Sequence, residues 1–155
     1  MLGLFVQTSL LHAELRDAEA QYNFAILHQH GKGVEQDDKK ALHWYTRAAK
    51  QGFAKAQYAL GKMYFEMSDR ERTLYYKKVL HWYTKAAEQG HMAAQYDLGM
   101  LYYTGSGVAV DDIQALDWIT KSAKQGYLPA HSLLEEITKS QNRAKVCLEN
   151  QYQDC

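Results

Sequence analysis

The chain has 155 residues, of which 46% are hydrophobic and 23% are charged, so it can form one folded domain or a short array of repeats. Its 18 basic and 18 acidic residues give a formal net charge of zero, which argues against a general nucleic-acid binder or a polybasic membrane-surface protein. No segment has the roughly 20 apolar residues that span a bilayer, so we expect no membrane insertion. The single proline and ten glycines favour helices over a β-sandwich with many turns.

The first residues, MLGLFVQTSLL, lack both the basic start and the cleavage site of a signal peptide. We therefore expect a cytoplasmic protein, and a periplasmic or secreted location would require that a signal peptide has been removed. The two cysteines, Cys147 and Cys155, lie near the end of the chain and do not form a disulfide framework. They are either reduced thiols or the site of a covalent link between chains.

The most informative feature of the sequence is a repeat. Trp44, Trp82 and Trp118 are separated by 38 and 36 residues, and a glycine follows each of them after eight residues. The surrounding segments read ALHWYTRAAKQGF, VLHWYTKAAEQGH and ALDWITKSAKQGY. Upstream of each comes a second recurring segment: AEAQYNFAILHQHGKGV, AKAQYALGKMYFEMS and MAAQYDLGMLYYTGSGV. Tandem units of about 36 residues predict a solenoid.

Each unit is predicted to contain two helices, which we name helix A and helix B. Helix A is expected at residues 18–30, 54–67 and 92–104, and helix B at residues 38–51, 69–89 and 112–125. Helix A is apolar around most of its circumference, which indicates that it lies between neighbouring helices. Aspartates that can cap helix B precede it in the first and third units, and glycine follows it in all three. These residues are Asp37, Asp38, Asp111, Asp112, Gly52, Gly90 and Gly126.

The repeats divide the chain into a single domain with five parts. Residues 1–17 are expected to form an N-terminal capping helix, because residues 4–16 resemble a degenerate helix B. Residues 18–53, 54–91 and 92–127 form the three repeats, of which the second is irregular. Residues 128–155 begin like another helix A, then lose the pattern, and are expected to form a partial repeat with a C-terminal cap or tail.

The pattern resembles the Sel-one-like repeat family, a relative of the tetratricopeptide repeat. The resemblance covers residues 18–137 and is carried in the third unit by Gln95, Leu98, Gly99, Tyr102, Gly105, Gly107, Val108, Ala115, Trp118, Ala123 and Gly126. It implies an all-α fold, a right-handed α-solenoid of antiparallel helix pairs. It further implies that helix A lines the concave side and that the chain acts as a protein-interaction scaffold.

The first unit departs from the family pattern at two positions. Ala25 replaces the glycine of the L-G pair and His28 replaces the tyrosine. Because alanine is also small, we expect the close packing of helix A and helix B to survive.

The second unit departs further, because it lacks the G-x-G-V turn and carries a two-residue insertion. Ser68 to Glu71 read S-x-x-E, a capping box, so we predict that helix B of this unit begins near Asp69 and runs for about 20 residues. Its extended end would project Arg70, Arg72, Tyr75 and Tyr76 as a second contact surface, with self-association as one use. The alternative is a longer disordered loop.

The resemblance also implies which side chains of helix A face the concave groove. They are Tyr22, Ile26, His30, Tyr58, Lys62, Phe65, Glu66, Tyr96, Met100 and Tyr103. Tyrosine is a common anchor of protein recognition, because its large ring is amphipathic and has few rotatable bonds. The alternative is that the tyrosines only pack helix A against the next repeat.

No chemical motif in the chain predicts catalysis or metal binding. His28 and His30 point in opposite directions on a helix, His43 and His81 lie one repeat apart, and no HExxH or CxxC occurs. The loops GKGV and GSGV are better explained as turns than as phosphate sites. We therefore expect no cofactor and a non-enzymatic scaffold that binds a peptide or protein segment in a Tyr-rich groove; the alternative is an enzyme or a small-ligand-binding repeat protein.

Overall fold

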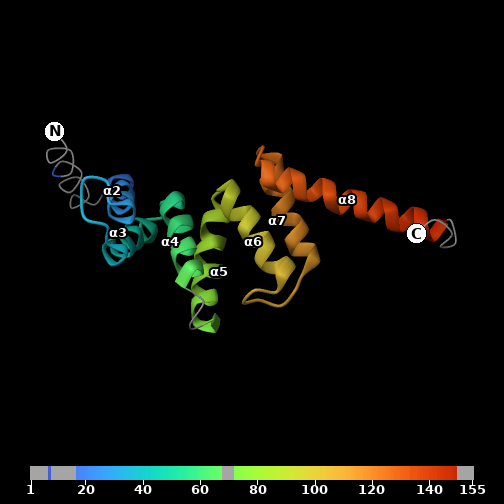
Figure 1. Cartoon of the computed structure of the whole chain (residues 1–155), viewed down its shortest axis with the longest axis horizontal. Coiled ribbons are helices and arrows are strands. Elements are labelled where there is room, and N and C mark those ends of the chain that lie inside the picture. The colour runs from blue at the N-terminus through green and yellow to red at the C-terminus, as the bar shows by residue number, and fades with distance from the viewer. Residues whose placement is uncertain (1–6, 8–16, 68–71, 150–155) are drawn as a thin grey trace.

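The computed structural model describes residue 7, residues 17–67 and residues 72–149, the backbone alone at 72–74 and 140–149 (Figure 1). Within these ranges the chain forms seven helices and no strand. The helices are α2 (Ala18–His30), α3 (Asp38–Lys50), α4 (Ala54–Glu66), α5 (Arg72–Glu88), α6 (Met92–Thr104), α7 (Asp112–Lys124) and α8 (Leu128–Glu149). The predicted all-α fold is therefore confirmed.

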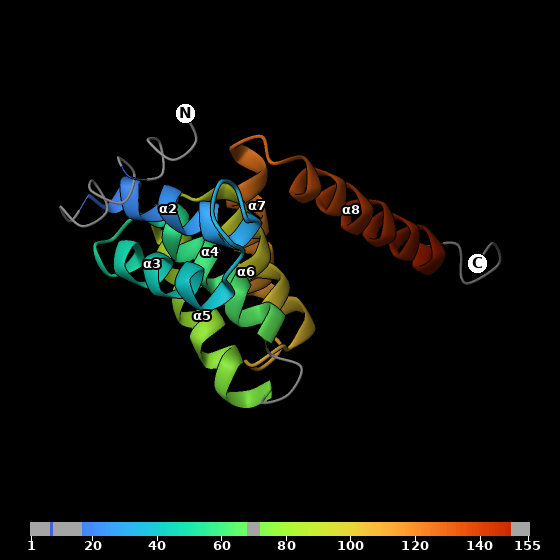
Figure 2. The same cartoon turned by 60° about the vertical axis from the view of Figure 1, so that its left-hand side comes forward.

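The helices stack as antiparallel pairs along the long axis of the molecule (Figures 1 and 2). Each pair is one unit, with α2, α4 and α6 as helix A and α3, α5 and α7 as helix B. Helix B of one unit packs against helix A of the next, through α3 with α4 and α5 with α6. This arrangement is the predicted right-handed α-solenoid.

The helix ends are set by the residues that the sequence pattern indicated. The side chains of Asp37 and Asp111 accept hydrogen bonds from the backbone N–H groups of Lys40 and Gln114, at 3.0 and 2.9 Å. Hydrogen-bonded caps of this kind satisfy N–H groups that have no partner within the helix. At the other end of helix B, Gly52, Gly90 and Gly126 have φ values of 90°, 85° and 86°. Side chains other than glycine rarely adopt this conformation, so these glycines allow the sharp turn into the next unit.

Small residues allow helix A and helix B to approach closely within each unit. A Cβ atom added to Gly61 would lie 2.5 Å from the ring of Tyr83, and one added to Gly99 would lie 2.7 Å from Ile119. In the first unit Ala25 occupies this position and is completely buried, as predicted.

A glutamine side chain in each helix A bonds to helix B of its own unit, and in the second and third units it also connects to the preceding unit. Its carboxamide oxygen accepts a hydrogen bond from a glutamine at the end of helix B in the same unit. The pairs are Gln51 to Gln21, Gln89 to Gln57 and Gln125 to Gln95, all at 2.7 Å. In the second and third units its nitrogen also donates to a backbone carbonyl of the preceding helix B: Gln57 to Ala49 at 3.2 Å and Gln95 to Ala87 at 3.0 Å. These bonds satisfy the buried carboxamides of Gln57 and Gln95 at the interfaces between the units.

The second unit has a longer helix B than its neighbours. Helix α5 has 17 residues in the described part of the chain, whereas α3 and α7 have 13 each. The predicted extension is confirmed from Arg72 onward, and the alternative of a disordered loop is wrong over that range. The predicted capping box, Ser68 to Glu71, lies outside the described residues.

Helix α8 continues the stack and then leaves it. It begins at Leu128 with Pro129 in its first turn, a position where the missing N–H of proline has no helical partner to lose. It then extends for 22 residues and projects away from the other helices in both views (Figures 1 and 2). The angle between α7 and α8 therefore leaves part of α7 without a covering helix.

Candidate interaction surface

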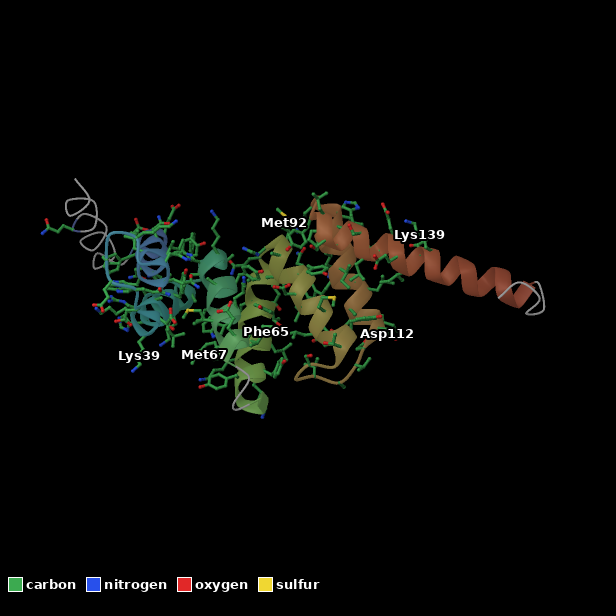
Figure 3. All side chains as sticks on the ribbon, in the orientation of Figure 1. Lys39, Phe65, Met67, Met92, Asp112 and Lys139 are labelled. Carbon is green, nitrogen blue, oxygen red and sulfur yellow. The ribbon has the colours of Figure 1, made fainter. Side chains whose placement is uncertain are left out.

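The ten side chains predicted to face a groove all lie on the successive helices A. We call them the helix-A surface, and Figure 3 shows Phe65, one of its members, near the end of α4. The exposed members are His30, Lys62, Phe65, Glu66 and Tyr103, and the half-buried members are Tyr22, Ile26, Tyr58, Tyr96 and Met100. The surface thus combines charged and aromatic side chains that solvent reaches to different degrees.

The three tyrosines at equivalent positions pack against the ring that follows each turn glycine. Tyr22 meets Phe53 with ring centroids 5.4 Å apart, Tyr58 meets His91 at 4.6 Å, and Tyr96 meets Tyr127 at 5.5 Å. Each contact joins helix A to the start of the next unit. The tyrosines therefore contribute to packing between units, and only part of each ring remains available for a partner.

A hydrogen bond joins the helices A of the second and third units. The hydroxyl of Tyr58 on α4 donates to Oδ2 of Asp97 on α6 at 2.9 Å. Burial raises the pKa of the Asp97 carboxyl, whereas this hydrogen bond and the nearby charge of Lys62 lower it, and the net direction is upward. Burial and the carboxylate together raise the pKa of Tyr58. The pair therefore holds a half-buried carboxylate beside a neutral phenol.

Asp97 was not among the predicted site residues. One signal for it exists in the sequence: in α6, MAAQYDLGMLYYT, Asp97 is the only charged residue. The equivalent positions in the first and second units are Asn23 and Ala59. A carboxylate in so apolar a helix could therefore have been identified as exceptional.

His91 lies beside this pair and caps α6. Its Nδ1 accepts a hydrogen bond from the backbone N–H of Ala94 at 3.2 Å, which requires the imidazole nitrogen to be unprotonated. Burial lowers the pKa of His91, and the positive charge of Lys55 lowers it further, against a hydrogen bond that raises it. Protonation of this nitrogen would remove the acceptor that caps α6.

The second predicted contact surface differs from expectation at its tyrosines. Tyr75 and Tyr76 are half-buried and do not project: their rings contact those of Tyr64 and Phe65, with centroids 6.1 and 6.0 Å apart. The extended α5 lies against the neighbouring elements because its apolar rings find partners there. Arg70 lies outside the described residues, as does the side chain of Arg72.

The described residues contain no group of three His, Cys, Asp or Glu side chains that could hold a metal ion. The histidines next to the repeated tryptophans contact those rings, His43 with Trp44 and His81 with Trp82, at 5.3 and 4.8 Å between centroids. Among the same residues no helix has the length and hydropathy of a membrane span.

The sequence model of the Sel1 repeat matches residues 18–53, 54–66, 76–91 and 93–127, which is more than half of the chain. Among curated proteins, the chain is 37% identical over 60 residues to the putative sel1-like repeat-containing protein L21 of Acanthamoeba polyphaga mimivirus. It is 50% identical over 40 residues to chitin synthase regulatory factor 3 of Schizosaccharomyces pombe. These matches cover 39% and 26% of the chain but only 11% and 4% of the two relatives.

Solved structures resemble the chain over most of its length. A Sel1 repeat protein from Oxalobacter formigenes is 34% identical with a TM-score of 0.74, and the match covers 84% of this chain and 96% of that one. The protective antigen c5321 of uropathogenic Escherichia coli, described as having an SLR fold, is 38% identical with a TM-score of 0.77. That match covers 85% of this chain and 28% of the antigen. Cysteine rich protein B of Helicobacter pylori shares the fold at 19% identity, with a TM-score of 0.64 and coverage of 85% and 93%.

Proposed function

We propose that this chain, which belongs to the Sel1 repeat family, is a non-enzymatic module that binds a segment of another protein on its helix-A surface. Sel1 repeat proteins are helical solenoids that typically mediate protein interactions and typically act as scaffolds without enzymatic activity. For this chain the proposal adds a location, the successive helices A, and a recognition group, the carboxylate of Asp97.

The observation that carries the proposal is the Tyr58–Asp97 pair. Solvation favours an ionised carboxylate, so holding Asp97 half-buried has a cost in free energy. The solenoid does not need a carboxylate at this position, because the equivalent residue of the preceding unit is Ala59. A polar group that packing does not require, held in place by a neighbouring unit, is suited to a polar contact with a partner.

The side chains around the pair support the same role. Lys62 and Glu66 lie one turn apart on α4 and are exposed, and Met100 on α6 is half-buried. Tyrosine, methionine and charged side chains in one area can provide both apolar contact and orientation for a bound segment. We propose that such a segment lies across α4 and α6 and places a basic side chain or an N–H group on Asp97.

The experiment selects a ligand and then tests the surface. Random peptides displayed on phage are selected against the whole chain, and the dissociation constant of a selected peptide is measured by fluorescence anisotropy. We expect Asp97→Asn and Lys62→Glu to change this constant at least about tenfold, as charge changes at the centre of an interface do. The matched control is Asp117→Asn, because Asp117 lies on α7 and is exposed, paired with Lys121 at 2.7 Å.

Two outcomes contradict the proposal. The first is that peptides are selected but bind Asp97→Asn and Lys62→Glu as tightly as the unchanged chain. The second is that Asp117→Asn weakens binding as much as Asp97→Asn does, which would place the ligand on α7. Circular dichroism and melting temperature show whether each variant is folded before binding is compared.

A further inference from the structure

A hollow of 420 Å³ lies where the end of α6 and the start of α7 meet α8. We call it the third-unit hollow. Leu116 and Ile119 of α7 and Leu133 and Ile137 of α8 form its apolar walls. It lies on the side of α7 from which α8 diverges, and Asp112 in Figure 3 marks the α7 end of this region.

The same hollow recurs in the first unit. There a space of 370 Å³ is lined by Gln29, Asp38, Leu42 and Met63, which occupy the repeat positions of Tyr103, Asp112, Leu116 and Ile137. The hollow is therefore a product of how helix A, helix B and the next helix A meet, and not an accident of one unit.

In the second unit an aromatic residue stands at the repeat position of Asp112. Tyr76 stands six residues before Trp82, as Asp112 stands six residues before Trp118. Its ring packs edge-on against Phe65, and a Cβ atom on Gly107 of the following loop would collide with it. The second unit thus shows which kind of side chain fits this junction.

The third-unit hollow lacks such a ring from its own helix B, since Asp112 is in the place of Tyr76. Tyr103, in the repeat position of Phe65, is 51% exposed, and Leu116 is 42% exposed. Nearby on α7, Ile113 is 84% exposed, so the hollow opens beside further apolar surface. Exposed apolar side chains gathered around a hollow are typical of a binding site for a partner.

The charges at this hollow determine what kind of partner fits. The carboxylates of Asp112 and Glu136 line it, and the described residues that line it include no Lys, Arg or His. Within the described part of the chain, neither carboxylate belongs to an ion pair. Two acids beside an apolar hollow complement a positive charge that is adjacent to an apolar group.

We propose that the third-unit hollow binds an aromatic side chain of a partner protein that is flanked by lysine or arginine. The ring takes the place that Tyr76 has in the second unit and lies against Tyr103, between α7 and α8. The flanking cation pairs with Asp112 and Glu136. This site shares Tyr103 with the helix-A surface but does not include Asp97, and it does not depend on the function proposed above.

The test uses three labelled Gly/Ser peptides that differ at their centre: Arg-Trp-Arg, Glu-Trp-Glu and Arg-Ala-Arg. Binding to the full chain is followed by amide chemical shifts in ¹⁵N spectra, which detect weak association and locate it. We expect saturable binding of the Arg-Trp-Arg peptide, with the largest shifts at Tyr103, Leu116 and Leu133. The other two peptides should bind at least about tenfold more weakly, because each lacks the flanking charge or the ring.

Point substitutions test whether the peptide binds at the hollow or elsewhere on the surface. Leu116→Lys, which places a positive charge at the hollow, should abolish binding of Arg-Trp-Arg. The control Leu128→Lys alters a residue that is 76% exposed and does not line the hollow, so it should leave binding unchanged. Asp97→Asn should also have no effect on this peptide, which distinguishes failure here from failure of the helix-A surface.

Three results would overturn the proposal. They are absence of binding by Arg-Trp-Arg, equal binding of Glu-Trp-Glu, and undiminished binding to Leu116→Lys. A fourth contradicting result would come from sedimentation of the chain. If the chain is a dimer that Leu116→Lys converts to a monomer, the hollow is occupied by a second copy and not by a partner of the proposed chemistry.

Discussion

The Tyr58 hydroxyl donates to the Asp97 carboxylate across 2.9 Å, and this bond joins the helices A of the second and third units. Tyr58 also contacts the rings of Tyr83 and His91, at 5.6 and 4.6 Å between centroids. The phenol is therefore fixed from several sides, and the carboxylate of Asp97 is held beside the helix-A surface by a residue of the preceding unit. This combination of packing and an ionisable group leads to the first two predictions.

Replacing Asp97 by asparagine should keep the fold and should not reduce stability at neutral pH. The asparagine oxygen can still accept the hydrogen bond from Tyr58, while the cost of a half-buried charge disappears. Because the folded chain raises the pKa of Asp97, the stability linked to its neutral form is present at low pH and is lost as the pH rises through that pKa.

We therefore expect Asp97→Asn to unfold with a free energy equal to that of the unchanged chain, or up to about 1 kcal/mol higher, at pH 7. The difference should shrink as the pH falls toward 4. Urea titrations at several pH values measure it, and a loss of more than about 1 kcal/mol at pH 7 would show that the carboxylate stabilises the solenoid.

His91 should make stability depend on pH in the weakly acidic range. The folded chain lowers the pKa of His91, so its contribution is complete above the ordinary value of about 6.5 and is lost as the pH falls through the lowered pKa. Protonation removes the acceptor that caps Ala94. The unchanged chain should thus lose stability between pH 7.5 and 5 through this group.

The variant His91→Ala lacks this titration and should be less stable at pH 7.5 by about 1 kcal/mol, the usual effect of losing a cap. Its disadvantage should diminish toward pH 5. Exposed His81 on α5 provides the control, since His81→Ala should follow the pH profile of the unchanged chain. If the stability of His91→Ala also follows the pH profile of the unchanged chain, the His91 cap is not the source of the pH dependence.

Gln57 should be more important for stability than its polar side chain suggests. It is only 3% exposed, accepts from Gln89 in its own unit and donates to the carbonyl of Ala49 in the preceding one. Gln57→Ala leaves the Gln89 amide and the Ala49 carbonyl without this partner. We therefore expect the free energy of unfolding to fall by about 2–4 kcal/mol.

A double-mutant cycle with Gln89→Ala isolates the hydrogen bond between the two glutamines. The coupling energy should be about 0.5–1.5 kcal/mol. Equilibrium unfolding in urea gives all four values. Additive losses from the two substitutions would mean that the glutamine pair contributes nothing beyond the separate contacts of its members.

Gly61→Ala should destabilise the chain although alanine is the better helix former. The new Cβ would lie 2.5 Å from the ring of Tyr83, which is 3% exposed and cannot move into solvent. Forcing a methyl group into a packed interior costs about 1–3 kcal/mol, more than the helix propensity returns.

The comparison for this prediction is Gly126→Ala. No atom lies within 4 Å of a Cβ at Gly126, but its φ of 86° strains any other residue. The Gly126 variant should therefore lose stability through the backbone, whereas the Gly61 variant loses it through contact. Adding Tyr83→Leu should rescue Gly61→Ala and leave Gly126→Ala unchanged; rescue of both or of neither contradicts the packing argument.

The repeated features of the fold were predictable because each occurs in all three units of the sequence. The spacing of the three tryptophans predicted the helix pairs. The glycines that follow helix B have the positive φ that we expected from their place at the helix end. Ala25 keeps the close contact of the first unit, as its size indicated. Such features follow from local propensity and spacing, which a sequence displays directly.

The features that occur once were harder to predict. The position of the Asp97 side chain depends on Tyr58, 39 residues away, and spacing alone does not reveal such a contact. Tyr75 and Tyr76 were expected to project, but rings that lie on α4 bury them in part. The divergence of α8 from the stack also depends on tertiary packing that no short pattern encodes.

The most direct test of the central claim is to locate a selected peptide on the folded chain by amide chemical shifts. The account predicts that the shifts cluster on α4 and α6, around Tyr58, Lys62, Asp97 and Met100. It also predicts that Asp97→Asn lowers the affinity for the peptide at least about tenfold. Shifts confined to the helices B, on α3, α5 and α7, with unchanged affinity for Asp97→Asn, would contradict it.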